Sequence, residues 1–275
     1  MKLLITGRPK SGKSTILSEL VAGASPRRGF ITKELVKDQR RTGFEVEDMN
    51  GVSAVLAQTQ NSTSLQVGRF YVHPEVLAQF TQNLSHPKTD ELLYLDEIGQ
   101  MQLHSNEFRL LVEAYLDAPN DFVATITSVF SDEFTTRILN RDDILLFHLT
   151  DINRNKVKKS LSIALASKDL FNELSTALQS TVVRYANNYL KEDLFIPFCK
   201  LFTNAIKYFM EERISTISAD KYVVKGNTKK HVVHFESSGE WSCDCPLSNG
   251  KEPYDEPMEC SHLQSVQLYR IEQSS

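Results

Sequence analysis

The fold of this chain is decided by one stretch near its start, Lys2-Leu3-Leu4-Ile5-Thr6-Gly7-Arg8-Pro9-Lys10-Ser11-Gly12-Lys13-Ser14-Thr15. A short apolar run typical of a β-strand leads into the pattern G-x-x-x-x-G-K-S, and apolar residues at helical spacing follow. A glycine at each end of the pattern lets the backbone curl, so that successive N–H groups point inward at a helix N-terminus and bind anions. The stretch therefore predicts a phosphate-binding loop between a strand and a helix.

The loop also predicts how a nucleotide is bound. Lys13 would reach the β- and γ-phosphates and assist catalysis, Ser14 would place its hydroxyl on Mg²⁺, and Thr15 would contact the α-phosphate. An ordinary glycine-rich turn is the alternative. The predicted nucleotide-binding residues are Gly7, Arg8, Pro9, Lys10, Ser11, Gly12, Lys13, Ser14 and Thr15.

A second apolar run ends in two acids and complements the loop. Residues 92–95, Leu-Leu-Tyr-Leu, precede Asp96 and Glu97, as in a buried parallel strand with a magnesium ligand at its carboxyl end. Asp96 is therefore the second predicted Mg²⁺ ligand, together with Ser14. Glu97 is predicted to orient and deprotonate the attacking water, which makes Lys13 and Glu97 the predicted catalytic residues. A solvated surface acid is the alternative for Glu97.

A charge-neutralising arginine is also expected, because such a group accelerates phosphoryl transfer by on the order of 10³–10⁵. The sequence does not choose between the candidates, each of which is an ordinary surface or structural arginine on the alternative interpretation. They are Arg8, Arg28, Arg69, Arg137, Arg141 and Arg154.

The apolar spacing predicts an α/β fold with a mostly parallel sheet, because runs that indicate strands alternate with runs at helical spacing. Stripes at three- and four-residue spacing then predict helices up to residue 217, and a hairpin follows. We expect a P-loop domain at 1–160, a helical segment at 161–217 and a small metal-binding module at 218–275. Strands are expected at 2–6, 29–34, 42–48, 52–56, 92–95, 122–126, 144–149, 221–225 and 231–235, and helices behind the loop, from 74, at 104–116 and at 132–139.

The composition is that of an ordinary globular chain of 275 residues, 41% hydrophobic and 24% charged. No run approaches the roughly 18 apolar residues that span a membrane, and the apolar start is too short for a signal peptide, so we expect a cytoplasmic protein with no membrane contact. The net charge of −4, from 31 basic and 35 acidic residues, argues against a large sequence-independent attraction to nucleic acid.

Three of the four cysteines gather near the end of the chain and predict a metal site. Cys243-x-Cys245 is followed, after 14 residues, by Cys260-x-His262. Two such pairs held by a hairpin offer sulfur and imidazole ligands of the number and type that Zn²⁺ prefers. Three unrelated thiols and a surface histidine are the alternative. Two further histidines are expected to be strand residues rather than ligands, namely His231 and His234.

Several motifs in order resemble the cancer-related nucleoside-triphosphatase family over roughly the first 160 residues. The resemblance implies a small P-loop enzyme that uses Mg²⁺ and hydrolyses several nucleoside triphosphates, such as ATP and GTP. Where the family usually carries an acid after the methionine, this chain has Gln102, so a second acidic role there is absent or taken elsewhere. The motifs are the loop itself, Gly29-Phe30-x-Thr32-x-Glu34, Gly43-Phe44, Val67-Gly68-Arg69-Phe70, Asp96-Glu97-Ile98-Gly99-x-Met101, Ser105-x-x-Phe108 and Leu149-Thr150-x-x-Asn153-Arg154.

The end of the chain, roughly residues 219–270, resembles the SWIM-type zinc finger, C-x-C…C-x-H, with its strands before the cysteines and apolar residues after them. The resemblance implies a protein or DNA partner. From residue 216 onward the chain has 6 basic and 9 acidic residues, which favours a protein partner over bare DNA.

Together these features predict an Mg²⁺-dependent nucleoside triphosphatase with a zinc-binding recognition tail. Two other functions stay open. One is a nucleotide-driven switch or DNA-binding accessory protein with slow hydrolysis, and the other is a small-molecule kinase that transfers phosphate to an acceptor other than water. Glu97 favours hydrolysis, because an acid that activates water has its use there.

Overall fold

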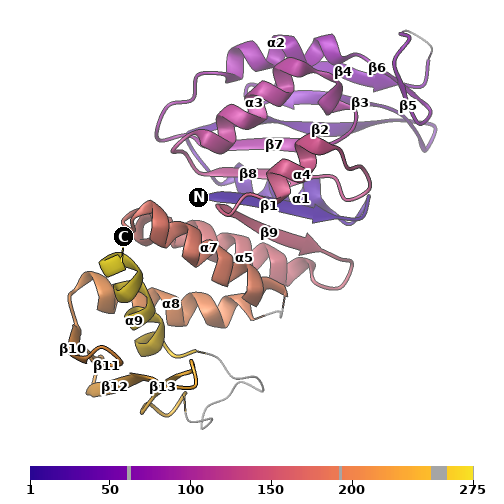
Figure 1. The fold of residues 1–275 in the computed structure, drawn as a ribbon. Coiled ribbons are helices and arrows are strands. Elements are labelled where there is room, and N and C mark those ends of the chain that lie inside the picture. Colours follow the sequence, from indigo (N-terminus) through magenta and orange to yellow (C-terminus); the bar gives the residue numbers. More distant parts are fainter. Residues whose placement is uncertain (61–62, 192–193, 249–258, 275) are drawn as a thin grey trace. The chain divides into compact units, whose positions relative to one another are not determined.

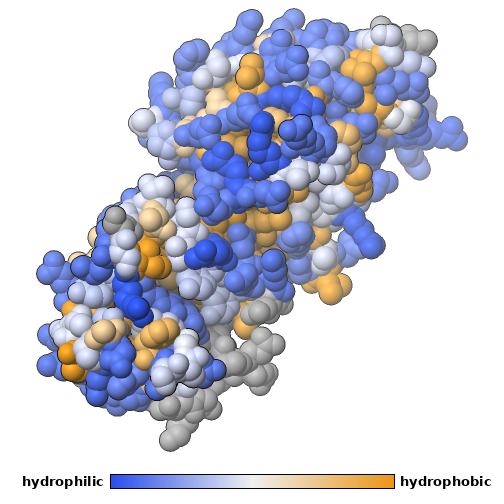
Figure 2. Space-filling view, in the orientation of Figure 1, coloured by the Kyte–Doolittle hydropathy of each residue, from blue (hydrophilic) through white to orange (hydrophobic). Residues whose placement is uncertain are grey.

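The computed structural model describes residues 1–60, 63–191, 194–248 and 259–274, and the chain divides into two compact units, residues 1–165 and 166–275 (Figure 1). Within the described residues, no helix has both the length and the apolar character needed to cross a bilayer. The face of the molecule seen in Figure 2 is mostly hydrophilic, with scattered apolar residues, since most large apolar side chains are buried.

The first unit is built on a nine-stranded sheet. Its strands, in spatial order, are β5 (Gln66–Val67), β6 (Phe70–Val72), β4 (Ser53–Gln58), β3 (Arg40–Asp48), β2 (Arg27–Lys37), β7 (Leu92–Ile98), β8 (Phe122–Ile126), β1 (Lys2–Gly7) and β9 (Ile144–Leu149). From β2 to β9 all neighbours pair in parallel, and the four strands beyond β2 pair antiparallel. The predicted α/β fold with a mostly parallel sheet is confirmed.

Side chains of the parallel strands are buried on both faces of the sheet. In β1, Leu4 belongs to the large apolar cluster that also includes residues of the helices α2, α3 and α4, whereas Leu3 and Ile5 are equally buried but alternate away from it. Burial on both faces explains why these strands are continuous apolar runs in the sequence. The helices of this unit are α1 (Lys13–Ala22), α2 (Pro74–Leu84), the 3₁₀ helix η1 (Gln102–His104), α3 (Asn106–Asp117), α4 (Glu133–Leu139) and α5 (Arg154–Ala166).

The second unit combines helices with a small antiparallel sheet. The helices α7 and α8 both pack against α9, and the sheet has the order β10-β11-β12-β13. Its core joins Tyr208 of α8, Tyr222 and Val233 of the sheet and Val266 of α9. The elements are α6 (Lys168–Asn172), α7 (Thr176–Lys191), α8 (Phe195–Met210), β10 (Ile214–Ser218), β11 (Lys221–Lys225), β12 (Lys230–Phe235), β13 (Trp241–Cys243) and α9 (Ser261–Ser274).

The structure differs from the expected secondary structure in one predicted helical stretch and in several elements that were not predicted. Residues 214–217 were expected to continue the helices, but α8 ends at Met210 and Ile214–Ser218 pairs antiparallel with β11. Glu212 has a left-handed φ of 52°, which ends the helix, and the β-branched residues that follow suit a strand. The short strands β5, β6 and β13 and the helix α9 were not anticipated. The division into segments 1–160, 161–217 and 218–275 stays a prediction.

Candidate functional site

Residues 7–15 connect β1 to α1, and the loop needs glycine at both ends. Gly7 and Gly12 have φ values of 152° and 96°, which side chains rarely adopt. A Cβ atom on Gly7 would lie 2.3 Å from the carbonyl oxygen of Leu149, and one on Gly12 would lie 1.7 Å from Nη2 of Arg154. The two glycines thus allow both the curl of the loop and the close approach of its neighbours.

The predicted lysine lies inside this curl. Lys13 is buried, and its Nζ atom donates hydrogen bonds to the carbonyl oxygens of Gly7, at 3.0 Å, and Arg8, at 3.2 Å. The hydroxyl of Ser11 is also buried, and it has no hydrogen-bond partner within the described part of the chain. A positive charge and an unpaired hydroxyl in one glycine-rich curl are suited to an anion.

The predicted magnesium ligands lie together at the end of β7. Asp96 is 0% exposed, and its Oδ1 atom accepts hydrogen bonds from the hydroxyls of Ser14, at 3.0 Å, and Thr125, at 2.5 Å. The backbone N–H of Thr32 donates to its other oxygen at 3.4 Å. Burial raises the pKa of the Asp96 carboxyl, and these hydrogen bonds and the charge of Lys13 oppose the rise. A hydroxyl and a buried carboxylate fit a hard cation such as Mg²⁺.

Glu97 differs from Asp96 in that its carboxylate is free to interact with a ligand. Within the described residues its carboxylate makes no hydrogen bond, and it is half-buried beside Asp96. Burial raises its pKa, the charge of Lys13 lowers the pKa, and the charge of Asp96 raises it. An unpaired carboxyl with a raised pKa in a cleft is what a general base needs near neutral pH.

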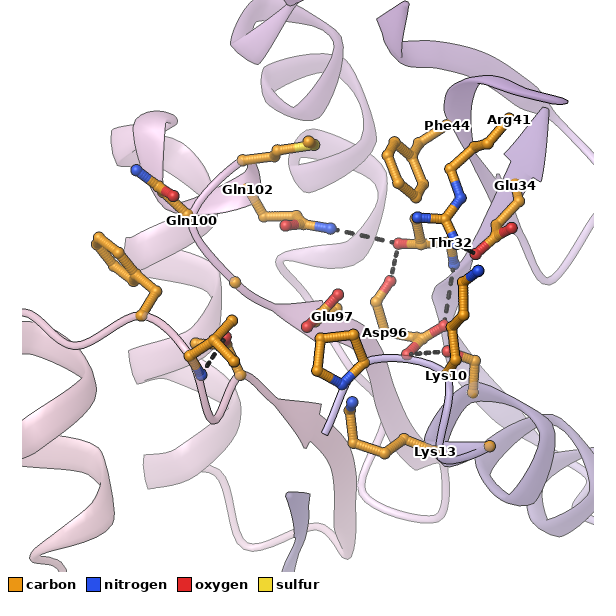
Figure 3. A pocket seen from close by; sticks show the side chains of 18 of the residues that line it. Lys10, Lys13, Thr32, Glu34, Arg41, Phe44, Asp96, Glu97, Gln100 and Gln102 are labelled. Carbon is orange, nitrogen blue, oxygen red and sulfur yellow. Dashed lines mark hydrogen bonds and ion pairs between the residues drawn. The ribbon is translucent and has the colours of Figure 1, made fainter. Parts of the chain in front are cut away.

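These groups line a cavity of about 660 Å³ (Figure 3). One wall is the phosphate-binding loop with the start of α1, and the other walls come from β2, β3, β5, the end of β7 with the residues that follow it, the residues that follow β8 and the start of α5. Gln102 is part of the lining, is buried, and its amide donates to the hydroxyl of Thr32 at 3.5 Å. A glutamine at the position where an acid was expected therefore still contacts the site, as a neutral hydrogen-bond donor.

The structure separates the six arginine candidates. Arg154, at the start of α5, lines the cavity and its Nη2 donates to the carbonyl oxygen of Ser11 at 3.0 Å. Arg28 is held by Glu91 through two hydrogen bonds of 2.6 and 2.9 Å, away from the cavity. The other candidates do not belong to the lining of this cavity as the described residues form it: Arg8, Arg69, Arg137 and Arg141.

One arginine of the lining was missed. Arg41, in β3, pairs with Glu34 in β2, and its guanidinium lies 5.3 Å from the ring centre of Phe44. No local motif marks Arg41, because its place in the lining depends on the pairing of β3 with β2.

The predicted zinc ligands also come together. One side-chain donor atom from each of Cys243, Cys245, Cys260 and His262 lies within 4.8 Å of the others. The three cysteines are buried and free, and Nδ1 of His262 is buried with no hydrogen-bond partner among the described residues. Three thiols and an unpaired imidazole nitrogen fit a tetrahedral Zn²⁺ site.

The surroundings of this cluster were only partly expected. His234 and His231 both lie in β12, as predicted strand residues. The ring of His231 also stacks on that of His262 with 4.1 Å between centres, and its Nδ1 lies 2.9 Å from Oδ1 of Asp244. Of the predicted loop between the two ligand pairs, residues 249–258 lie outside the described residues.

A parallel sheet whose first strand runs through a glycine-rich loop into a helix, with a buried carboxylate at the end of the next strand but one in the sheet, defines the class of P-loop nucleotide-binding proteins. A family model described as NTPase matches residues 2–162, and the chain belongs to this family. The second unit lies beyond that match.

Individual relatives agree with the family. The nucleoside-triphosphatase THEP1 of Thermotoga sp. (strain RQ2) is 38% identical over 159 residues, which are 57% of this chain and 91% of the relative. Among solved structures, the crystal structure of THEP1 from Aquifex aeolicus is similar with a TM-score of 0.53 and 27% identity, over 58% of this chain and 96% of that one. The solution structure of a human cancer-related nucleoside triphosphatase is similar with a TM-score of 0.52 and 26% identity, over 60% and 97%.

The loop geometry makes a prediction about stability. Gly12→Ala is expected to destabilise the turn by about 1–2 kcal/mol through the left-handed backbone alone, and to displace Arg154 as well. Hydrogen exchange of the amides in α1, measured on the full chain, should show faster opening. Gly23→Ala is the matched control, because Gly23 has a φ of −83° and a Cβ there would meet no atom within 4 Å. Equal exchange in both variants would contradict the strain.

Proposed function

We propose that the first unit hydrolyses nucleoside triphosphates to diphosphate and phosphate in the presence of Mg²⁺. The observation that carries this proposal is the position of Glu97, an unpaired carboxyl with a raised pKa next to Lys13 and Asp96. The NTPase family and the printed names of the relatives support the same activity.

Different residues of the cavity would carry out different steps of this reaction. The N–H groups of the loop and the ammonium of Lys13 would bind the phosphates, and the oxygens of Ser14 and Asp96 would hold Mg²⁺. When bound, Mg²⁺ neutralises the charge that develops on the phosphates. Glu97 would orient the attacking water and accept its proton. Arg154 lies against the loop, where its charge would stabilise the transition state.

The test is phosphate release from ATP, GTP, CTP and UTP by the full chain with Mg²⁺. Glu97→Gln is expected to lower kcat by about 10²–10⁴, because a neutral amide cannot accept the proton of water. Lys13→Ala is expected to abolish turnover and weaken nucleotide binding. Glu133→Gln, an exposed acid of α4 outside the cavity, is the control and should match the parent chain.

The pH profile provides a second readout of the same assignment. Glu97 can act as a base only when it is deprotonated. Because its pKa is raised above the ordinary glutamate value of 4.5, lowering the pH should already reduce activity at pH values above 4.5. Nucleotide binding without turnover in the parent chain would contradict hydrolysis and favour a switch. Product formation that depends on an added acceptor would instead favour a kinase.

We further propose that the cysteine cluster of the second unit binds Zn²⁺ through Cys243, Cys245, Cys260 and His262. The support is the closeness of the four donors and the unpaired Nδ1 of His262. The three thiols are part of the core under the small sheet, so metal binding, worth on the order of 10 kcal/mol in zinc peptides, would stabilise this sheet. The second unit, ordered by the metal, would then bind a protein partner or DNA.

Loss of one ligand should release the metal. Cys260→Ser is expected to abolish stoichiometric zinc by elemental analysis and to lower the melting temperature of the second unit. Cys199→Ser is the control, since Cys199 lies in α8 outside the cluster and should keep the zinc. Full zinc content in Cys260→Ser would refute the site.

A salt titration distinguishes a DNA partner from a protein partner. Retention of the full chain on DNA that weakens steeply with added salt would indicate several phosphate contacts and favour DNA. The acidic excess of the tail predicts weak retention instead.

A further inference from the structure

A second cavity adjoins the first one on the side of the β2–β3 hairpin. It has a volume of about 480 Å³ and shares Lys10, Glu34 and Arg41 with the larger cavity. Its remaining lining comes from the hairpin turn and from Arg69, in the turn between β5 and β6. The two cavities are therefore continuous at these three shared side chains.

Positive charge dominates this second cavity. Lys10, Arg40, Arg41 and Arg69 line it, and Glu34 is the one acid among the described residues of the lining. Glu34 pairs with Arg41, and within the described part of the chain neither Lys10 nor Arg40 has an ion-pair partner. The cavity thus holds an uncompensated positive charge, which favours an anionic ligand.

Arg41 also has an unused hydrogen-bond donor. Its Nε is buried and has no partner among the described residues, although Nη2 bonds Glu34. The ring of Phe44 under the guanidinium and the ion pair with Glu34 hold the side chain of Arg41, whereas Arg69 bonds only its backbone carbonyl oxygen, at 2.7 Å. The planar guanidinium is a group that binds phosphate well, and here one acid, Glu34, neutralises it.

The second cavity adjoins the larger one close to Asp96. Thr32, whose N–H bonds Asp96, is two residues before Glu34 in β2, and Lys10 belongs to the loop itself. Figure 3 shows Lys10, Glu34 and Arg41 grouped on one side of the cavity, next to Asp96. Asp96 and Glu97 mark the place of the γ-phosphate, so a group attached beyond that phosphate would enter the positively charged extension.

We infer that this extension is a subsite for a phosphate group carried beyond the γ-phosphate, so that substrates with four or more phosphates, such as nucleoside tetraphosphates, are bound and cleaved. The inference rests on the proposed hydrolysis. Water attacks the γ-phosphorus, the bond from that phosphorus to the oxygen bridging the β-phosphate breaks, and Glu97 takes the proton of the water. A nucleoside tetraphosphate therefore yields nucleoside diphosphate and pyrophosphate.

The experiment compares adenosine tetraphosphate with ATP on the full chain with Mg²⁺. The ratio of their kcat/KM values is expected to fall about tenfold in the double variant Arg40→Gln/Arg69→Gln, since each exposed charge contributes a factor of about three. Turnover of ATP should stay the same, because neither arginine lines the larger cavity. Raised salt should lower the ratio in the parent chain and have little effect on it in the double variant.

Two further variants separate the subsite from general effects. Lys37→Gln removes a positive charge from the residue paired with Arg40 across the hairpin, outside the lining, and should leave the ratio unchanged. Arg69→Lys keeps the charge and should retain most of the ratio. If Lys37→Gln lowered the ratio as much as the double variant does, the effect would come from the net charge of the hairpin, and the subsite would be overturned.

The products and free phosphate provide the decisive outcomes. Release of ATP and orthophosphate from the tetraphosphate would place its last phosphate in the γ position and overturn the inference. Inhibition by orthophosphate that weakens in the double variant, with an unchanged substrate ratio, would assign the cavity to free phosphate and also overturn the inference.

The parent chain separates this inference from the proposed function. If it turns over ATP but not the tetraphosphate, the inference fails and the proposed function stands. If the parent chain turns over neither nucleotide, the proposed function fails. The subsite is then tested by binding: it would be overturned if adenosine tetraphosphate displaced a fluorescent nucleotide from the double variant as well as from the parent chain.

Discussion

A fully buried carboxylate is the constraint on which the first unit depends. Asp96 is removed from water at the end of β7, and such a charge is costly unless hydrogen bonds or a cation compensate it. Its partners are Ser14 in α1, Thr125 in β8 and the backbone of Thr32 in β2. One carboxylate therefore ties the helix behind the phosphate-binding loop to two strands, and the proposed function assigns the same carboxylate to Mg²⁺.

The order of the sheet brings these groups together. Ser14 and Asp96 are 82 residues apart in the chain, yet β8 alone separates β1 from β7. Because the strands from β2 to β9 are parallel, their carboxyl ends meet at one edge, where ligands bind in such sheets. Beyond β2 the sheet continues antiparallel, and this extension supplies Arg41 and the positively charged second cavity that the parallel strands alone would lack.

The second unit reaches its stability by another route. The core that includes the sheet β10–β13 is small, and three of its buried members are the cysteines of the cluster. The proposed zinc site would stabilise a core of this size, because bound metal would hold β13 and the start of α9 together. The stacking of His231 on His262 adds an aromatic contact that orders one of these ligands.

The sequence by itself determined the elements whose chemistry is local. The loop from Gly7 to Thr15, the acids at the end of β7 and the pairs of the cysteine and histidine cluster each follow from spacing within a few residues, because backbone curl, strand burial and side-chain pairing act over that range. The tertiary structure decided what depends on distant partners. It placed Arg154 against the loop, it brought Arg41 to the cavity by pairing β3 with β2, and it turned residues 214–218 into a strand by pairing them with β11. Register and packing arise from contacts between segments far apart in the chain, and no local pattern encodes them.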